Sequence, residues 1–475
     1  MLTCLEVDGF KNLRGLVIEF GPFTCIAGEN SAGKSNVFDA IEFLSLLSSN
    51  SLMEAAQKIR ATRDERSGDP RELFWRGAED RLIRLAAEMI VPAHVEDDFG
   101  RNAEPSVTFV RYEVEIGYEP ATGLEKIGRL VLIRESLQPI KLGEARRRLG
   151  FPHDKTFRDA VVTGANRART KSPFISTADR EDDSVIIVHQ DGGSRGKPKP
   201  ASAARAPATV LSTITGADDP TILAARREMQ SWRRLALEPS ALRASDRYSD
   251  PRLMDANGRH LAGALFRIAT RRPTSGGNPD PAGTYARVAT RLSSLTGLGV
   301  RRVVVDTDDT RELITLRLEE PGGVEVPARS LSEGTLRFLA LAVLLEDSDA
   351  RGVVCMEEPE NGIHPANLGT MVDLLRDLAF DPSEAPGEGN PFRQVIANTH
   401  SPGLVQLLND DEILFATADY ARRSNGEISR ALHQAPLAGT WREGRQSVPP
   451  VTKIDILPYL TTPVGAQLTL EPASA

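Results

Sequence analysis

The sequence predicts an α/β fold in which a mixed sheet, with a parallel core and an antiparallel N-terminal layer, is interrupted by a helix-rich, basic insertion. Three observations support this prediction. An apolar segment at 23–27 runs into a glycine-rich loop and then into an amphipathic helix at 35–47. Segments 110–116 and 130–133 alternate apolar and polar residues, as antiparallel strands do. Residues 303–400 alternate strand and helix patterns, which is typical of a parallel sheet covered by helices.

Length and composition indicate an ordinary globular protein. The 475 residues are about three times a domain of ~150, so we expect two or three domains or one large interrupted one. The net charge is −8, and 40% hydrophobic with 26% charged residues excludes disordered and collagen-like classes. No run of about 18 apolar residues and no signal-peptide pattern occur, so we expect a cytoplasmic protein without a membrane partner.

The first predicted lobe covers residues 1–140. Short apolar strands are expected at 2–7, 16–20 and 23–27, and the helix at 35–47 places Val37, Ile41 and Leu44 on one face. The cysteines lie in apolar strands without the spacing of a zinc site, so we expect buried thiols; they are Cys4, Cys25 and Cys355.

Residues 141–254 are predicted to be the insertion. Residues 141–171 contain nine Lys and Arg against three acidic residues, a local charge of +6 within a chain of −8. Such a run is either a phosphate-contacting surface or a solvated charged segment. Residues 191–208 are too poor in apolar side chains to order themselves and are expected to form a flexible loop.

The second predicted lobe covers residues 255–415, and residues 416–475 form a C-terminal extension. Strands are expected at 303–305 and 313–318, followed by a strongly apolar helix at 336–345. A buried strand at 353–356, a helix at 368–378 and a strand at 394–398 complete the series.

The strongest motif is the sequence Gly-Glu-Asn-Ser-Ala-Gly-Lys-Ser at 28–35, which matches the phosphate-binding loop in full and lies between a strand and a helix. Backbone N–H groups of the loop and of the helix N-terminus bind phosphate oxygens, Lys34 adds a full charge, and the Ser35 hydroxyl is a ligand for Mg²⁺. The predicted cofactors are therefore ATP and Mg²⁺. The residues expected to bind the nucleotide are Gly28, Glu29, Asn30, Ser31, Ala32, Gly33, Lys34, Ser35 and Asn36.

Two carboxylates follow the buried strand at 353–356. Adjacent side chains on a strand point in opposite directions, so one acid can face a metal ion and the other a water molecule. We assign Glu357 to Mg²⁺ and Glu358 to activation of the attacking water. The alternative is an exposed acidic turn before Pro359.

Several further motifs occur in order along the chain: Glu29-Asn30, Asn36, Asp39-Ala40-Ile41, and the segments 331–335, 357–365 and 398–402. Together they resemble the ABC-type ATPases of the RecF, SMC and OLD kind, and more narrowly the bacterial AAA-family ATPases of anti-phage and DNA-repair systems. The resemblance covers about 1–47 and 255–415. It departs from the usual pattern at Glu357, where most ABC proteins have Asp, and in the signature, which is Ser-Glu-Gly where most have Ser-Gly-Gly. About 70 residues follow His400, too few for the Toprim nuclease domain of OLD-type proteins.

The resemblance implies a P-loop NTPase fold with an ABC-type head that dimerises head to tail. Nucleotide would lie between the phosphate loop of one copy and the signature Ser332-Glu333-Gly334 of the other. His400 falls at the switch histidine, which is expected to touch the γ-phosphate, and is assigned a catalytic role with Glu358. From the residues alone, Ser332 is an equally good helix N-cap, and His364 is expected to be structural.

The predicted function is that of an ATP-binding and ATP-hydrolysing homodimer, or higher homo-oligomer, that couples its nucleotide state to DNA or to a nucleic-acid-processing partner such as a nuclease. Anti-phage defence or DNA repair is the expected setting. The alternative is an ATP-dependent assembly scaffold that holds or restrains a separate nuclease or toxin, with slow or dispensable hydrolysis. The interrupted middle of the chain disfavours the energy subunit of a transporter.

Overall fold

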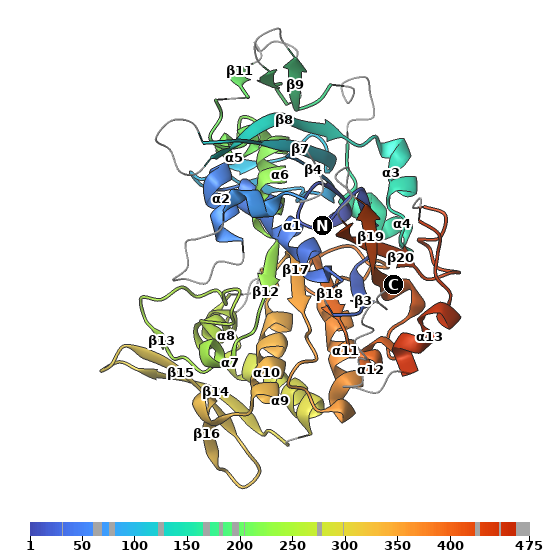
Figure 1. Ribbon diagram of the computed structural model, residues 1–475. Helices are drawn as coiled ribbons and strands as arrows, with labels where there is room; N and C mark the ends of the chain where they lie inside the picture. The colour runs from blue at the N-terminus through green and yellow to red at the C-terminus, as the bar shows by residue number, and fades with distance from the viewer. Residues whose placement is uncertain are drawn as a thin grey trace.

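Two large sheets frame the molecule, and the helix that follows the glycine-rich loop is packed between them (Figure 1). The computed structural model describes residues 1–30, 32–59, 69–75, 81–121, 128–164, 172–179, 184–191, 199–203, 205–272, 278–297, 299–422, 428–445 and 448–461. Among these residues no helix has the length and hydrophobicity needed to cross a membrane.

The central sheet is parallel through five neighbouring strands, and its sixth strand is antiparallel. Its buried middle strand, β3, lies between two strands from the C-terminal part of the chain. In spatial order the strands are β12 (Arg233–Leu235), β17 (Gly352–Glu357), β18 (Arg393–Thr399), β3 (Phe23–Gly28), β19 (Ile413–Arg422) and β20 (Ile428–Pro436). The carboxyl ends of β17, β18 and β3 therefore meet at one edge, where ligands bind in such sheets.

The second sheet is the predicted antiparallel layer. The long strand β7 alternates buried and half-buried residues, so one face packs on the core, which confirms the alternation read at 110–116. In spatial order its described strands are β11 (Lys199–Ser202), β10 (Ser184–Val188), β9 (Ile175–Asp179), β8 (Arg129–Pro139), β7 (Phe109–Glu119), β4 (Leu82–Ile90), β1 (Leu2–Asp8) and β2 (Leu16–Glu19).

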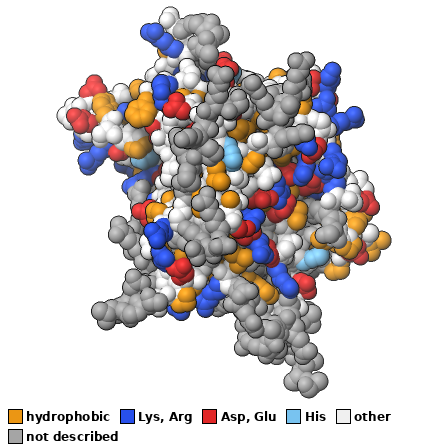
Figure 2. Space-filling view, turned by 90° about the horizontal axis from the view of Figure 1, so that it is seen from above, with side chains coloured by type: hydrophobic (Ala, Val, Ile, Leu, Met, Phe, Trp, Pro, Cys, Tyr) orange, Lys and Arg blue, Asp and Glu red, His pale blue; other side chains and the backbone are white. Residues whose placement is uncertain are grey.

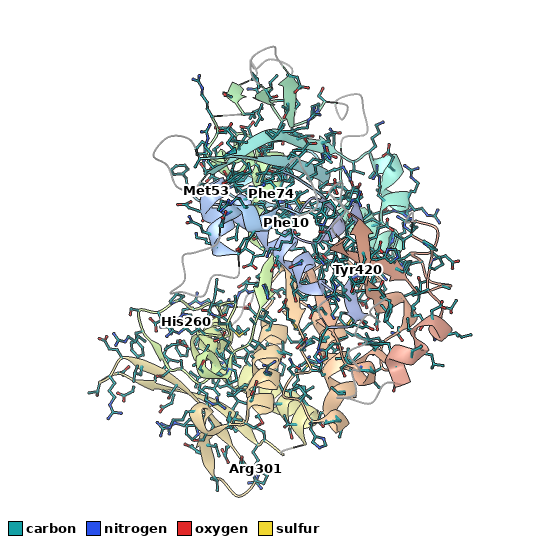
Figure 3. All side chains as sticks on the ribbon, in the orientation of Figure 1. Phe10, Met53, Phe74, His260, Arg301 and Tyr420 are labelled. Atoms are coloured by element: carbon teal, nitrogen blue, oxygen red, sulfur yellow. The ribbon has the colours of Figure 1, made fainter. Side chains whose placement is uncertain are left out.

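Helices α1 (Lys34–Leu47) and α6 (Pro220–Gln230) fill the space between the two sheets. Phe10 stacks on Phe43 of α1 with ring centroids 5.7 Å apart, and Figure 3 shows Phe10 in this layer. Shorter elements at this end are α2 (Leu52–Lys58), α5 (Val210–Thr213), β5 (Val95–Glu96), β6 (Asn102–Ala103) and the 3₁₀ helix Pro70–Leu73. The three cysteines are buried and free, as expected.

A second lobe lies on the other face of the parallel sheet and has its own apolar core. The strands predicted at 303–305 and 313–318 are present, but they leave the parallel sheet and pair antiparallel with each other. The strands are β13 (Asp246–Arg247), β14 (Arg302–Asp308), β15 (Leu313–Glu319) and β16 (Glu325–Pro327). The helices are α7 (Pro239–Leu242), α8 (Leu261–Thr270), α9 (Pro281–Thr296), α10 (Glu333–Glu346), α11 (Leu368–Leu378), α12 (Pro402–Val405) and α13 (Lys453–Thr461), with 3₁₀ helices Ala328–Ser330, Pro365–Asn367 and Asp410–Glu412.

The interval 141–254 departs from the predicted insertion in two ways. It contributes α3 (Leu142–Arg148) and α4 (Lys155–Val161), but also strands β9 to β11, and its end forms β12 of the parallel sheet. The flexible loop predicted at 191–208 is wrong for 199–202, because Ala201 pairs with Ile186 in the antiparallel sheet. Residues 192–198 and 204 lie outside the described residues.

Candidate nucleotide-binding site

The phosphate loop leaves the carboxyl end of β3 and enters α1. A side chain at Gly28 is excluded by its neighbour, because a Cβ there would lie 2.1 Å from the carbonyl oxygen of Ala416 on β19. Gly33 is the N-cap of α1 with φ 102°, in the left-handed region that favours glycine. Glu29 and Asn30 are exposed and Ala32 is buried, whereas Ser31 lies outside the described residues.

Lys34 lies over the loop that precedes it. Its Nζ donates to the carbonyl oxygens of Gly28 and Glu29, both at 2.7 Å. Burial lowers the pKa of the Lys34 ammonium, and the nearby negative charge of Glu358 acts in the opposite direction. Ser35 follows on the first turn of α1 and is half-buried. The predicted cation and the predicted hydroxyl therefore stand together at the start of the helix.

Asn12, in the turn between β1 and β2, supports the loop from outside the motif. Its Nδ2 donates to the carbonyl oxygen of Ala32 at 3.0 Å, and its Oδ1 accepts from Asn36 Nδ2 at 2.6 Å. Its own carbonyl accepts from the backbone N–H of Leu432 on β20 at 2.9 Å. A Cβ at Gly33 would lie 2.0 Å from Asn12 Nδ2, so this contact also requires the glycine. Nothing in the local sequence around Asn12 indicates this role.

Glu358 and His400 lie together, as their predicted roles require. Glu358 has φ 44°, and its backbone N–H donates to the carbonyl and the side-chain oxygen of Asn398, both at 3.1 Å. Its carboxylate accepts from Asn361 Nδ2 at 2.6 Å and pairs with His400 Nδ1 at 2.7 Å. The left-handed turn thus ends β17 and fixes the carboxylate between an amide and an imidazole.

Glu357 points to a different set of partners. Its Oε2 pairs with Arg234 Nη2 at 2.8 Å, and Arg234 Nη1 also contacts Asp39 Oδ1 at 3.1 Å. Asp39 is fully buried on α1 and pairs with Lys11 Nζ at 2.6 Å. The sequence did not indicate Arg234, because the three-residue strand β12 that carries it shows no recognisable pattern.

The oxygens at this edge fit Mg²⁺. Glu357 Oε1 is buried and has no hydrogen-bond partner among the residues that the structure describes. The Ser35 hydroxyl, on the first turn of α1, supplies a second oxygen of the kind this cation prefers. Arg234 therefore orients the Glu357 carboxylate through one oxygen and leaves the other oxygen available to bind a metal ion.

Two further groups border the phosphate loop. Glu360 is buried, accepts from Thr399 Oγ1, and its pKa is raised by burial and by the charge of Glu358. Tyr459 of α13 packs its ring on Phe415, with centroids 5.4 Å apart. Phe415 pairs with Ala27 of β3, which brings the ring of Tyr459 close to the start of the loop, and burial raises the pKa of its phenol. In the sequence, Glu360 is recognisable only as part of the segment 357–365, and no local pattern indicates a role for Tyr459.

The signature segment lies elsewhere on the same chain. Ser332 is exposed and caps α10, because its Oγ accepts from the N–H of Thr335 at 3.2 Å. Gly334 lies so close to the turn at Gly362 that a Cβ on Gly334 would be 3.0 Å from the carbonyl oxygen of Gly362. The Glu333 carboxylate pairs with Arg337 at 2.9 Å. The contacts of this segment are with Thr335, Arg337 and Gly362. His364 caps a 3₁₀ helix by accepting from the N–H of Ala366 at 3.2 Å, the structural role expected for it.

Part of the chain is similar in sequence to known proteins. The chain is 35% identical over 94 residues to the DNA replication and repair protein RecF of Synechococcus sp. (strain JA-3-3Ab), and 32% identical over 120 residues to the structural maintenance of chromosomes protein 1 of Schizosaccharomyces pombe. These matches cover 20% and 24% of this chain, and the chain spans 21% of the first relative and 8% of the second.

Similar solved structures include SMC heads. One is the SmcHead bound to the C-winged helix domain of ScpA, with a TM-score of 0.42 and 15% identity over 92% of this chain and 98% of that one. Another is the SMC head domain from Thermotoga maritima, with a TM-score of 0.34 and 13% identity over 91% and 98% of the two chains.

Two family matches account for most of the chain. Residues 4–103 match a family described as "AAA domain". Residues 110–406, more than half of the chain, match the family described as "AAA domain, putative AbiEii toxin, Type IV TA system". The chain therefore belongs to this AAA domain family, is similar in part of its sequence to RecF and SMC proteins, and has an α/β fold in which the phosphate loop joins β3 to α1.

Proposed function

We propose that this protein binds ATP with Mg²⁺ at residues 28–35 and hydrolyses it. One observation carries the proposal: Lys34, Glu357 and the Glu358–His400 pair come together at the carboxyl ends of three adjacent parallel strands. Each group has the chemistry that phosphoryl transfer to water needs, namely a cation for the phosphates, an acid for the metal and a base for the water.

The roles follow from the contacts. Lys34 and the loop N–H groups bind the phosphates, and Ser35 with Glu357 would hold Mg²⁺, which supplies positive charge toward the developing negative charge when bound. Glu358 accepts a proton from the attacking water. His400 and Asn361 hold its carboxylate at 2.7 and 2.6 Å, so its orientation is fixed before the reaction.

We further propose that the complete site needs two copies of the chain. The N-terminus of α10 carries partial positive charge and suits a phosphate, yet within one chain Gly334 lies against Gly362 and Ile363. Ser332 is exposed and Glu333 and Gly334 are half-buried, so the signature can be reached by the phosphate loop of a second copy. In a head-to-tail homodimer, each phosphate loop faces the signature segment of the other copy, so both sites are complete.

The nucleotide state is proposed to act on DNA or on a nucleic-acid-processing protein such as a nuclease, in anti-phage defence or DNA repair. The family description names a toxin of a toxin–antitoxin system, and the matched relatives are named for DNA replication and repair and for chromosome maintenance. These names support the setting, and the basic residues of α3 and α4 supply a surface of the required charge.

Two variants test hydrolysis separately from binding. Glu358→Gln keeps the size of the side chain but loses the base, so ATP turnover should fall by roughly 10²–10⁴-fold while calorimetry shows ATP still bound. Lys34→Ala should lose ATP binding itself. Glu72→Gln, an exposed glutamate far from the site in the chain, is the matched control and should turn over ATP at the wild-type rate.

Each result bears on a separate assignment. Wild-type turnover in Glu358→Gln would refute its role as base, and wild-type ATP affinity in Lys34→Ala would refute the phosphate loop. With ATP, light scattering should show Glu358→Gln as a larger, ATP-loaded species. If the protein's biological activity survives in Glu358→Gln but not in Lys34→Ala, ATP acts as a structural ligand and the assembly-scaffold alternative is correct.

A further inference from the structure

A second cationic hollow lies at the opposite end of the parallel sheet from the phosphate loop. It has a volume of about 480 Å³, with Arg146, His153, Lys155 and Arg158 on its walls. We call it the basic pocket. Its lining also includes the buried apolar side chains of Leu149 and Phe151.

Contacts with the loop before β18 fix this position. Phe157 of α4 stacks on Phe380 with centroids 5.0 Å apart and planes 7° apart. The N–H of Asp154 donates to the carbonyl oxygen of Pro382 at 3.0 Å, and that of Phe380 donates to Arg393, the first residue of β18. The basic pocket is thus built on the amino end of the sheet, whereas Lys34 stands at the carboxyl end.

The cations of the basic pocket are weakly compensated. The side chains of Lys155 and Arg158 face a single acid, Asp159, at 4.0 and 3.7 Å, and that acid is 58% exposed. Exposed pairs at such distances contribute little. Among the residues that the structure describes, Arg146 forms no ion pair. Three full positive charges therefore surround one hollow with one loosely held counter-charge.

The neighbouring arginines are in a different state. Arg148 turns inward and pairs with Glu88, which is only 2% exposed. Arg445 lies against Gly150 and is neutralised by a bidentate pair with Glu19, both contacts at 2.7 Å. The run 146–148 in the sequence therefore contains one residue of the pocket wall, Arg146, and one structural residue, Arg148.

The chemistry of the pocket favours a phosphate ligand. Guanidinium and ammonium groups recognise phosphate oxygens through charge-assisted hydrogen bonds. The volume falls in the range of pockets that take nucleotide-sized ligands, larger than a single anion needs. Arg147 is exposed on the adjoining α3, and Lys141, the N-cap of that helix, is exposed and only loosely paired with Glu144 at 3.8 Å, so positive charge continues beyond the pocket.

Cations that extend beyond the pocket fit a polymer with regularly spaced phosphates better than a single small anion. The chain carries a net charge of −8, and Figure 2 shows basic and acidic side chains interspersed on the face that it presents. Attraction for a polyanion must then be local, at a site such as this one. We propose that the basic pocket binds backbone phosphates of a polynucleotide through Arg146, Lys155 and Arg158.

This inference deepens the proposed coupling to nucleic acid, and it does not depend on ATP hydrolysis. The test compares the full-length wild type with two triple variants that remove the same charge. One carries Arg146→Gln, Lys155→Gln and Arg158→Gln. The control changes three exposed arginines elsewhere, Arg129→Gln, Arg287→Gln and Arg311→Gln. Thermal unfolding establishes that both variants are folded.

Fluorescence anisotropy with a labelled DNA duplex, over a series of salt concentrations, measures the number of phosphates contacted. Loss of three contacts should reduce the slope of log affinity against log salt by up to ~2.7, at ~0.9 for each phosphate. The control variant should keep the wild-type slope. A wild-type slope in the pocket variant overturns the proposal.

Two further arms separate the outcomes. Calorimetry with inorganic phosphate alone distinguishes a polynucleotide site from a small-anion site, and phosphate binding as tight as the duplex would overturn the polynucleotide assignment. If the wild type hydrolyses ATP but binds no DNA at low salt, the pocket proposal fails while the ATPase stands. If DNA binding depends on the pocket and ATP is not hydrolysed, the pocket proposal stands and the ATPase assignment fails.

Discussion

Asn12 offers the sharpest test of how the phosphate loop is held. The change Asn12→Ala removes the donor to Ala32 at 3.0 Å and the acceptor for Asn36 at 2.6 Å, and adds no charge. A neutral hydrogen bond contributes about 1 kcal/mol net, so the two together hold the loop by about 2 kcal/mol. If this energy keeps the loop in its binding-competent form, its loss should weaken ATP affinity by up to about 30-fold.

The assay is calorimetry with a non-hydrolysable ATP analogue, together with thermal unfolding in the absence of nucleotide. A double-mutant cycle with Asn36→Ala isolates the contact between the two amides, for which we expect a coupling of about 1 kcal/mol. Binding by Asn12→Ala within about twofold of the wild type, with no coupling in the cycle, would refute the bracing role.

Three further predictions concern the dimer, a buried acid and a half-buried arginine. Mixing Lys34→Ala with Ser332→Arg chains should restore part of the lost ATPase activity, because hybrid dimers keep one intact site; no recovery at any ratio would contradict a shared site. Burial raises the pKa of Glu135 to about 7, so between the ordinary carboxyl pKa and pH 7 the folded protein keeps a proton on Glu135 that the unfolded chain has released. The free energy of unfolding should therefore fall as the pH rises through this range. Glu135→Gln should flatten this dependence on pH in thermal melts. Arg234→Met leaves Glu357 Oε2 without its partner and should destabilise the fold by about 2–3 kcal/mol, with partial rescue by Arg234→Lys; unfolding at the wild-type temperature would contradict it.

The local motifs were readable in the sequence because each is continuous in the chain. The phosphate loop ending in Lys34 combines a strand, a turn and a helix within 25 residues, and the alternation in β7 follows directly from one buried face. The supports of the site were not readable. Asn12, Arg234 and Tyr459 reach it from turns, an edge strand and the last described helix, and their roles depend on tertiary contacts that leave no local pattern.

The basic residues at 141–171 also show what the sequence alone could not predict. Composition identified an excess of positive charge at 141–171 but could not tell which arginines face solvent. Only the fold separates Arg146, on the wall of a hollow, from Arg148, which pairs inward with Glu88. Arg167, Arg169 and Lys171 of the same run lie outside the described residues.

The position of β3 also sets an order of events during synthesis. β3 is made early, yet both of its sheet neighbours, β18 and β19, are made only after most of the chain. Until then this fully buried strand has exposed edges, which makes the nascent chain prone to aggregation and its folding slow. A chain that stops before β18 would contain the whole glycine-rich motif and still lack the sheet that holds it. We therefore expect ATP binding to appear only once the C-terminal strands are complete, and truncated chains to depend on chaperones.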